Sequence, residues 1–116
     1  MAHKYHAKAT EVDGIRFASK KEARRYSDLM LLWKVEKIAG LELQPRYLLG
    51  TDKNPVLQRS SRYPNGRRVS YLADFRYYDR ESSSEVVEDV KGMDTPLSKL
   101  KRAVVEAQYG IRIVLV

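Results

Sequence analysis

The chain has 116 residues, of which 43% are hydrophobic and 32% charged, and these values are typical of one folded domain rather than of a disordered chain. No apolar run approaches the roughly 20 residues of a membrane helix, and the absence of cysteine excludes disulfides, thiol catalysis and thiolate metal sites. The 22 basic and 15 acidic residues give a formal net charge of +7, which favours a polyanionic partner such as nucleic acid.

Residues 1–18 form a basic lead-in. Its first residues, MAHKYHAKAT, lack the apolar stretch of a secretory signal, so we expect the protein to act in the cytoplasm. His3 and His6 have a spacing seen in metal sites, but a single pair in a basic terminus is usually solvated. An Asp-Gly pair predicts a turn before a short strand over residues 15–17.

The pattern predicts a helix from about Lys20 to Ala39. Ser19 is a favourable N-cap and Gly40 a favourable stop after the last turn. The helix carries one apolar stripe that we expect to face a sheet, made of Tyr26, Leu29, Met30 and Trp33.

Several strands follow, over residues 41–49, 56–62 and 67–78. The last two flank Tyr-Pro-Asn-Gly, in which Asn-Gly is a strong hairpin signal. No acidic residue occurs between Asp52 and Asp74, so the hairpin or loop over residues 50–68 is basic.

The rest of the chain predicts a strand over residues 86–91, a second helix from Asp94 or Thr95 to about Tyr109, and a final strand after Gly110. The fold class expected for this single domain is therefore α/β or α+β, a mixed sheet flanked by helices in the order α-β-β-β-β-α-β.

Charged residues interrupt two of these strands. With a period of two, Val69, Tyr71, Ala73, Phe75 and Tyr77 share one face of their strand and Asp74 lies on the other. In the next strand Asp89 and Lys91 share a face, so neighbouring strands would bring Asp74 and Asp89 together. Two close carboxylates repel unless one is protonated or a cation bridges them, and their oxygen ligands suit Mg²⁺ or Mn²⁺.

Asp74 followed by Asp89-Val90-Lys91-Gly92 resembles the signature of the PD-(D/E)xK nuclease superfamily, with alanine in place of the proline. The wider pattern KYHAKAT, GIRFASKKEARRY, LELQPRY, YLADFRYYD and VVEDVKG resembles a small phage-encoded family related to the phage endonucleases that resolve Holliday junctions.

This resemblance implies a restriction-endonuclease-like core and catalytic roles for Glu22, Asp74, Asp89 and Lys91, with the three acids as ligands of Mg²⁺, for which Mn²⁺ would substitute. The implied activity is a metal-dependent endodeoxyribonuclease acting on branched or structured DNA inside a phage-infected cell, as a homodimer that cuts two strands. The alternative is a non-catalytic nucleic-acid-binding module that keeps the fold.

Each site residue also has an ordinary structural interpretation. In this interpretation Glu22 forms a capping box with Ser19, and Asp89 and Lys91 form an ordinary cross-strand salt bridge. Glu88 points away from Asp89 and is expected to be solvated or salt-bridged. Gln44 is either a support for the site or a hydrogen-bonded sheet residue.

Basic residues outside the motif are expected to contact DNA phosphates, which would position the nucleic acid without reading its sequence. For the residues of the second helix, a solvated surface is the alternative. The predicted contacts are Lys20, Lys21, Arg59, Arg62, Arg67, Arg68, Lys99 and Lys101, and Arg102 is a further candidate. The tyrosines Tyr26, Tyr71 and Tyr77 are expected in the core rather than as platforms for bases.

Overall fold

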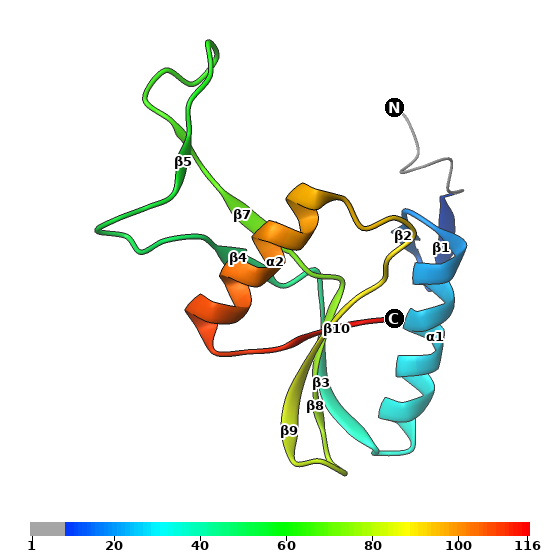
Figure 1. Cartoon of the computed structure of the whole chain (residues 1–116). Coiled ribbons are helices and arrows are strands. Elements are labelled where there is room, and N and C mark those ends of the chain that lie inside the picture. The colour runs from blue at the N-terminus through cyan, green and yellow to red at the C-terminus, as the bar shows by residue number, and fades with distance from the viewer. Residues whose placement is uncertain (1–8) are drawn as a thin grey trace.

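Two helices and a mixed sheet form the body of the protein over residues 9–116, the part of the chain that the computed structural model describes (Figure 1). The expected α+β class is therefore confirmed, whereas His3 and His6 lie outside the described residues. The elements of the body are α1 (Lys20–Lys34), β3 (Ile38–Leu43), β8 (Phe75–Asp79), β9 (Ser84–Asp89), α2 (Pro96–Tyr109) and β10 (Ile113–Leu115).

The central sheet has the strand order β10-β9-β8-β3. β8 pairs antiparallel with both β3 and β9, whereas β10 runs parallel to β9. Parallel neighbours need a crossover connection, and α2 provides it between β9 and β10. Neither helix of residues 9–116 is long and apolar enough to cross a membrane.

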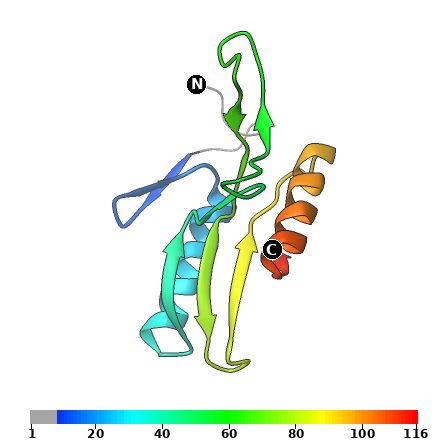
Figure 2. The same cartoon turned by 90° about the vertical axis from the view of Figure 1, so that its left-hand side faces the viewer.

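The remaining strands are short and lie outside the central sheet. They are β1 (Thr10–Val12) paired with β2 (Ile15–Phe17), β4 (Arg46–Leu48) paired with β7 (Ser70–Leu72), and β5 (Leu57–Gln58) paired with β6 (Arg67–Arg68). Residues 50–69, which we call the arm, extend away from the body around β5 and β6 (Figures 1 and 2). The expected hairpin at Asn-Gly is thus present, although its paired strands are shorter than predicted and extra strands surround it.

The first helix ends earlier than its pattern predicts. Ser19 accepts a hydrogen bond from the backbone N–H of Glu22 at 3.1 Å, as expected of an N-cap, but the helix stops at Lys34. Glu36 has a left-handed φ of 62°, and β3 then begins at Ile38 and runs through Gly40. The predicted end at Ala39 is wrong because residues 38 and 39 pair with β8, and this non-local pairing overrides the local helical signal.

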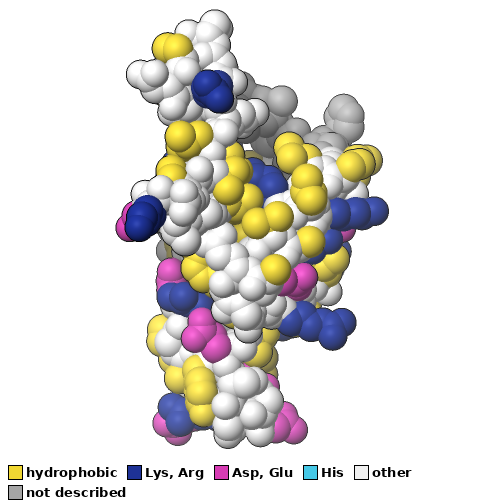
Figure 3. All heavy atoms as spheres, turned by 60° about the vertical axis from the view of Figure 1, so that its left-hand side comes forward, with side chains coloured by type: hydrophobic (Ala, Val, Ile, Leu, Met, Phe, Trp, Pro, Cys, Tyr) yellow, Lys and Arg dark blue, Asp and Glu magenta, His cyan; other side chains and the backbone are white. Residues whose placement is uncertain are grey.

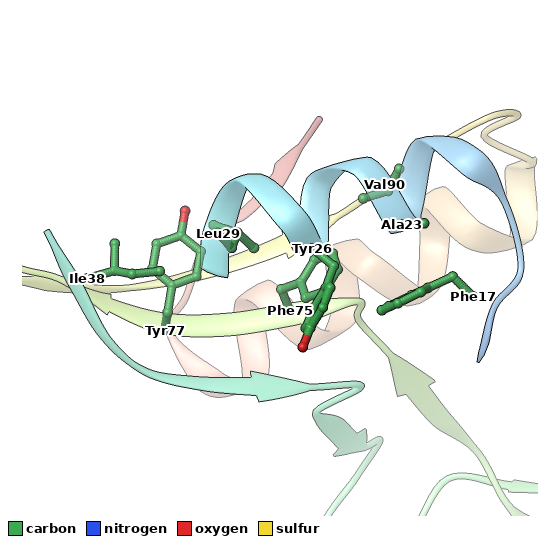
Figure 4. Packing of buried hydrophobic residues seen from close by; sticks show 8 residues of the cluster. All are labelled: Phe17, Ala23, Tyr26, Leu29, Ile38, Phe75, Tyr77 and Val90. Atoms are coloured by element: carbon green, nitrogen blue, oxygen red, sulfur yellow. The ribbon is translucent and has the colours of Figure 1, made fainter. Parts of the chain in front are cut away.

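One core lies between α1 and the sheet (Figure 4). Of the predicted apolar stripe, Tyr26 and Leu29 are buried in it, but Met30 is only partly buried and Trp33 is 41% exposed. The buried members of this first core are Phe17, Ala23, Tyr26, Leu29, Ile38, Phe75, Tyr77 and Val90.

A second core lies between the sheet and α2. Alternation along β9 separates the two cores, since Val86 packs against the first and Val87 belongs to the second. Its buried members are Tyr47, Leu49, Tyr71, Ala73, Val87, Val105 and Ile113.

The strand that was predicted to be continuous through Asp74 is broken there. Tyr71 and Ala73 belong to the second core whereas Phe75 and Tyr77 belong to the first, so the prediction that they share one face is wrong. The reason is that β7 ends at Leu72 and pairs with β4 in a separate sheet, while β8 starts at Phe75. This break places Asp74 between the two cores.

Candidate active site

Asp74 is anchored at the strand break by its backbone and by its side chain. Phe75 pairs with Glu88, and continuing this antiparallel register by one residue brings Asp74 opposite Asp89. The backbone N–H of Asp74 donates to the carbonyl oxygen of Glu88 at 3.0 Å, and the N–H of Val90 donates to Asp74 Oδ2 at 2.6 Å. The prediction that Asp74 and Asp89 lie close together is therefore confirmed.

The Asp74 carboxyl group lies in an environment that disfavours its charge. Burial, a hydrogen bond with Asp89 and the charges of Glu22 and Asp89 raise the pKa of Asp74 to about 8, whereas the bond from the Val90 N–H acts in the opposite direction. The raised pKa favours the protonated form of Asp74 at neutral pH. A negative charge on Asp74 is therefore disfavoured beside Glu22 and Asp89, and a proton or a bound cation would relieve the repulsion.

Asp89 is 2% exposed, and its side chain is held from two directions. The Tyr71 hydroxyl group donates a hydrogen bond to Asp89 Oδ2, and Lys91 Nζ lies 2.9 Å from the same oxygen. Lys91 Nζ also donates to Ser98 Oγ at 2.9 Å, so β9 and α2 together fix the ammonium group. Burial, followed by the bond to Asp89, raises the pKa of Tyr71, which keeps its hydroxyl group a proton donor.

Glu22 reaches the site from the first turn of α1, where its side chain is buried at 8% exposure. Its charge contributes to the raised pKa of Asp74, so Glu22 lies near the aspartate pair. Within residues 9–116, however, no three acidic or histidine side chains are already grouped as a metal-binding set. The backbone N–H of Glu22 also donates to Ser19 at the start of the helix. Glu22 therefore takes part in the helix cap and lies near the aspartates as well.

A pocket of about 320 Å³ opens beside Lys91, between β7 and the start of α2. Its lining combines Tyr71 and Lys91 with the apolar residues Leu72 and Leu97. Hydrophobic side chains gather on the face of the molecule that Figure 3 shows, below the arm. The Lys91 ammonium group therefore connects the buried carboxylates to a space that a solute can enter.

Residues 2–114 match the family described as "Protein of unknown function (DUF1064)". The chain belongs to this family. Comparison with curated proteins and with solved structures gives no match.

In this DUF1064 chain, Tyr71 and Ser98 are site residues that the sequence did not predict. Tyr71 was expected in the core, where it is buried, but its hydroxyl group also contacts Asp89. Arg102 lies near Tyr71 and forms a salt bridge with Asp94 at 2.6 Å. The only sequence signal for Ser98 is its position in the first turn of the helix that follows Lys91.

Glu88 lies on the opposite face of β9 and is not solvated. It is 1% exposed and accepts hydrogen bonds from Arg25 Nε at 2.7 Å and Nη2 at 2.5 Å, and from the Tyr77 hydroxyl group. The salt-bridged alternative is therefore the correct one. This pair joins α1 to the sheet and is separate from the aspartate pair.

The basic residues predicted near the motif lie on both sides of it. Lys21 Nζ donates to the carbonyl oxygen of Lys91 at 2.9 Å, and Lys101 lines the pocket. Lys20 and Lys99 are exposed at the first turns of α1 and α2. All four therefore lie on the two helices that carry Glu22 and Ser98.

The arginines of the arm have different environments. Arg59, Arg62 and Arg67 are exposed, so they are available to a ligand. Arg68 is partly buried and donates to the carbonyl oxygens of Leu49 at 3.0 Å and Gly50 at 2.9 Å, so it braces the base of the arm. Its contact with phosphate stays a prediction.

Gln44 contributes through its backbone. It has a left-handed φ of 51°, its side chain is exposed, and its N–H donates to the carbonyl oxygen of Asp74 at 2.9 Å. Gln44 thus supports the strand break at Asp74 by a main-chain hydrogen bond.

Proposed function

We propose that the protein is a metal-dependent endodeoxyribonuclease of the PD-(D/E)xK type, which hydrolyses phosphodiester bonds in branched DNA in the cytoplasm of a phage-infected cell. The observation that carries the proposal is the placement of Asp74 opposite Asp89 at the strand break, with the Lys91 ammonium group 2.9 Å from Asp89. The net charge of +7 supports a nucleic-acid substrate.

The donor set fits a divalent cation such as Mg²⁺, for which Mn²⁺ would substitute. Carboxylate oxygens are the ligands that these ions prefer, and Mg²⁺ commonly keeps several waters beside one or two carboxylates. The charges of Glu22 and Asp89 raise the pKa of Asp74, and a cation relieves this excess of negative charge. Asp74 and Asp89 would hold the ion, and Glu22 would assist directly or through water.

A bound Mg²⁺ would lower the pKa of a coordinated water and neutralise charge on the phosphate. The protein's own residues orient the reaction. Tyr71 and Lys91 fix the Asp89 carboxylate, and Ser98 holds the Lys91 ammonium group at the edge of the pocket. From this position Lys91 would align the attacking water and stabilise negative charge that develops on the phosphate oxygens.

One observation favours a second candidate, a non-catalytic nucleic-acid-binding module. Asp89 is 2% exposed, and its Oδ2 already accepts hydrogen bonds from Tyr71 and Lys91. Such a closed network is also what a structural ion pair would contain. The nuclease is preferred because Asp74 remains partly exposed and Lys91 lines a pocket, which leaves the site accessible to a phosphate.

The deciding experiment measures Mg²⁺-dependent cleavage of a four-way junction, a flap and a linear duplex of matched sequence. Wild type should cut, and Lys91→Ala should retain DNA binding while cleavage falls to background. Lys37→Ala, which changes an exposed lysine in the turn between α1 and β3, is the matched control and should cut like wild type. If wild type binds DNA equally with and without metal and cuts none of the three, the binding module is correct.

A homodimer is part of the proposal because two strands must be cut and each chain has one such site. Light scattering of the protein alone and with a junction measures the mass directly. A mass of one chain per junction, together with cleavage of both strands, would contradict the dimer but not the nuclease.

A further inference from the structure

The arm is a braced structure in which backbone groups are paired. Arg68 binds the carbonyl oxygens of Leu49 and Gly50, and the N–H of Val56 donates to the Leu49 carbonyl oxygen at 3.1 Å. The N–H of Val69 in turn donates to Val56 at 2.9 Å. These hydrogen bonds join the outgoing and returning segments of the arm at its base. The fold therefore sets the direction in which the arm projects.

The base of the arm is also fastened to the end of α2. Gln108 Nε2 donates to the carbonyl oxygens of Leu48 at 3.1 Å and Gly50 at 2.9 Å, and Gln108 Oε1 accepts from the Gly50 N–H at 2.8 Å. The Tyr109 hydroxyl group adds a bond to the Leu48 carbonyl oxygen at 2.8 Å. The first turn of the same helix holds Lys91 through Ser98, so α2 connects the arm rigidly to the candidate active site.

The tip of the arm holds an aromatic ring with two guanidinium groups close to it. Tyr63 is 39% exposed, and the guanidinium carbons of Arg62 and Arg67 lie 5.8 and 5.4 Å from its ring centroid. The tip turn is ordered by backbone bonds, since the Tyr63 carbonyl oxygen accepts from Gly66 at 2.9 Å and from Ser60 at 3.2 Å. The exposed part of the ring lies at the end of the arm, where a ligand can reach it.

The positive charge of the arm favours a ligand that carries phosphate groups. Residues 53–73 contain no acidic residue, and the arm stands clear of the body with basic side chains on it (Figure 3). Guanidinium groups bind phosphates, whereas an aromatic ring binds the face of a base. In an intact duplex the base faces are stacked against each other, so a ring can reach one only where the stack is interrupted.

The length of the arm limits where that base lies. Eleven residue steps separate Tyr63 from Asp74, and at roughly 3.3 Å for each extended residue the tip lies within about 36 Å of the carboxylates. This distance is close to one turn of B-DNA, which is about 34–36 Å or ten base pairs.

We propose that the tip of the arm, Tyr63 with Arg62 and Arg67, binds an unstacked base at a DNA branch point and thereby selects branched DNA. The position of the cut, within about ten base pairs of that base, rests on the proposed nuclease function. Recognition of the branch by the tip does not depend on cleavage.

The test compares Tyr63→Ala, Tyr63→Phe and the control Tyr78→Ala, which changes a tyrosine of β8 with similar exposure, 44% against 39%. Affinity is measured by fluorescence anisotropy without divalent metal, for a four-way junction and a linear duplex of equal length. Loss of one stacked base should weaken junction binding by Tyr63→Ala about 5- to 150-fold and leave duplex binding within about 2-fold. Tyr63→Phe and Tyr78→Ala should bind like wild type.

A second measurement reports on the base itself. With 2-aminopurine at the branch point, wild type and Tyr63→Phe should change its fluorescence and Tyr63→Ala should not. Thermal melting verifies that Tyr63→Ala is folded, which is expected because the ring is at an exposed tip.

The outcomes separate the two proposals. If wild type cuts the junction and Tyr63→Ala binds it as tightly as wild type, or loses junction and duplex affinity equally, the role of the tip is refuted and the nuclease stands. If wild type never cuts but its preference for junctions disappears in Tyr63→Ala, the nuclease is refuted and the role of the tip stands.

Discussion

The Asp74→Asn variant tests the electrostatics of the site without changing its shape. Asparagine has the size of aspartate, can accept the bond from the Val90 N–H through its oxygen, and remains neutral at every pH. The charged groups near this position are Glu22 of α1 and Asp89 of β9, and Lys91, two residues after the end of β9, contacts Asp89. The substitution therefore removes one titration from the site and leaves the other charges in place.

The expected effect follows from the difference between the folded and unfolded pKa values of Asp74. The folded value is about 8, and an unfolded aspartate titrates near about 3.9. In metal-free protein the folded state holds a proton that the unfolded state releases, so the stabilising contribution is complete below about pH 4 and is lost as the pH rises towards 8. Each unit of pKa difference is worth about 1.4 kcal/mol, and partial exposure of Asp74 reduces the total to a few kcal/mol.

Urea unfolding in EDTA between pH 4 and pH 8.5 measures this effect. Asp74→Asn should match wild type near pH 4 and exceed its unfolding free energy by a few kcal/mol at pH 8. Asp28→Asn, an exposed position on α1, is the control and should follow wild type throughout. Mg²⁺ should raise the melting temperature of wild type but not of Asp74→Asn. Parallel stability curves for wild type and Asp74→Asn would refute the raised pKa.

Three further substitutions test the framework around the site. Arg25→Met leaves the Glu88 charge buried with only Tyr77 as partner, and urea unfolding should show a loss of about 3–5 kcal/mol; an effect below about 1 kcal/mol would contradict that pairing. Leu29→Ala opens a cavity beneath α1, where the side chain is 0% exposed, and should cost about 2–5 kcal/mol in the same assay. Gly50→Ala should displace the arm, because a Cβ there would lie 2.5 Å from a backbone oxygen and φ is +78°. Limited proteolysis should then cut the arm faster than in wild type and cut the body at an unchanged rate.

Local patterns were sufficient to anticipate the acidic pair but not its setting. Alternation in two adjacent strands predicted that Asp74 and Asp89 approach each other and that Lys91 lies beside Asp89, and these contacts are present. The same alternation placed Glu88 on the other face, where Arg25 pairs with it. Period and spacing carry this information because side chains of an extended chain alternate regardless of their neighbours.

Non-local contacts account for the errors. The end of α1 was misplaced because β8 recruits residues 38 and 39 into the sheet. The break at Asp74 was missed because β7 pairs with β4 outside the central sheet. The hydrogen bonds of Arg68 to two backbone carbonyl groups were also missed, because these partners are 18 and 19 residues away in the chain.

The amino-acid sequence by itself determined the charge, the order of the main helices and the approach of Asp74 to Asp89, since these depend on composition and on short-range periodicity. The tertiary structure decided which groups raise the pKa of Asp74, which arginines remain exposed and how the arm is joined to α2. The physical reason is that protonation and hydrogen bonding depend on distances between groups from different elements, and those distances exist only after the chain has folded.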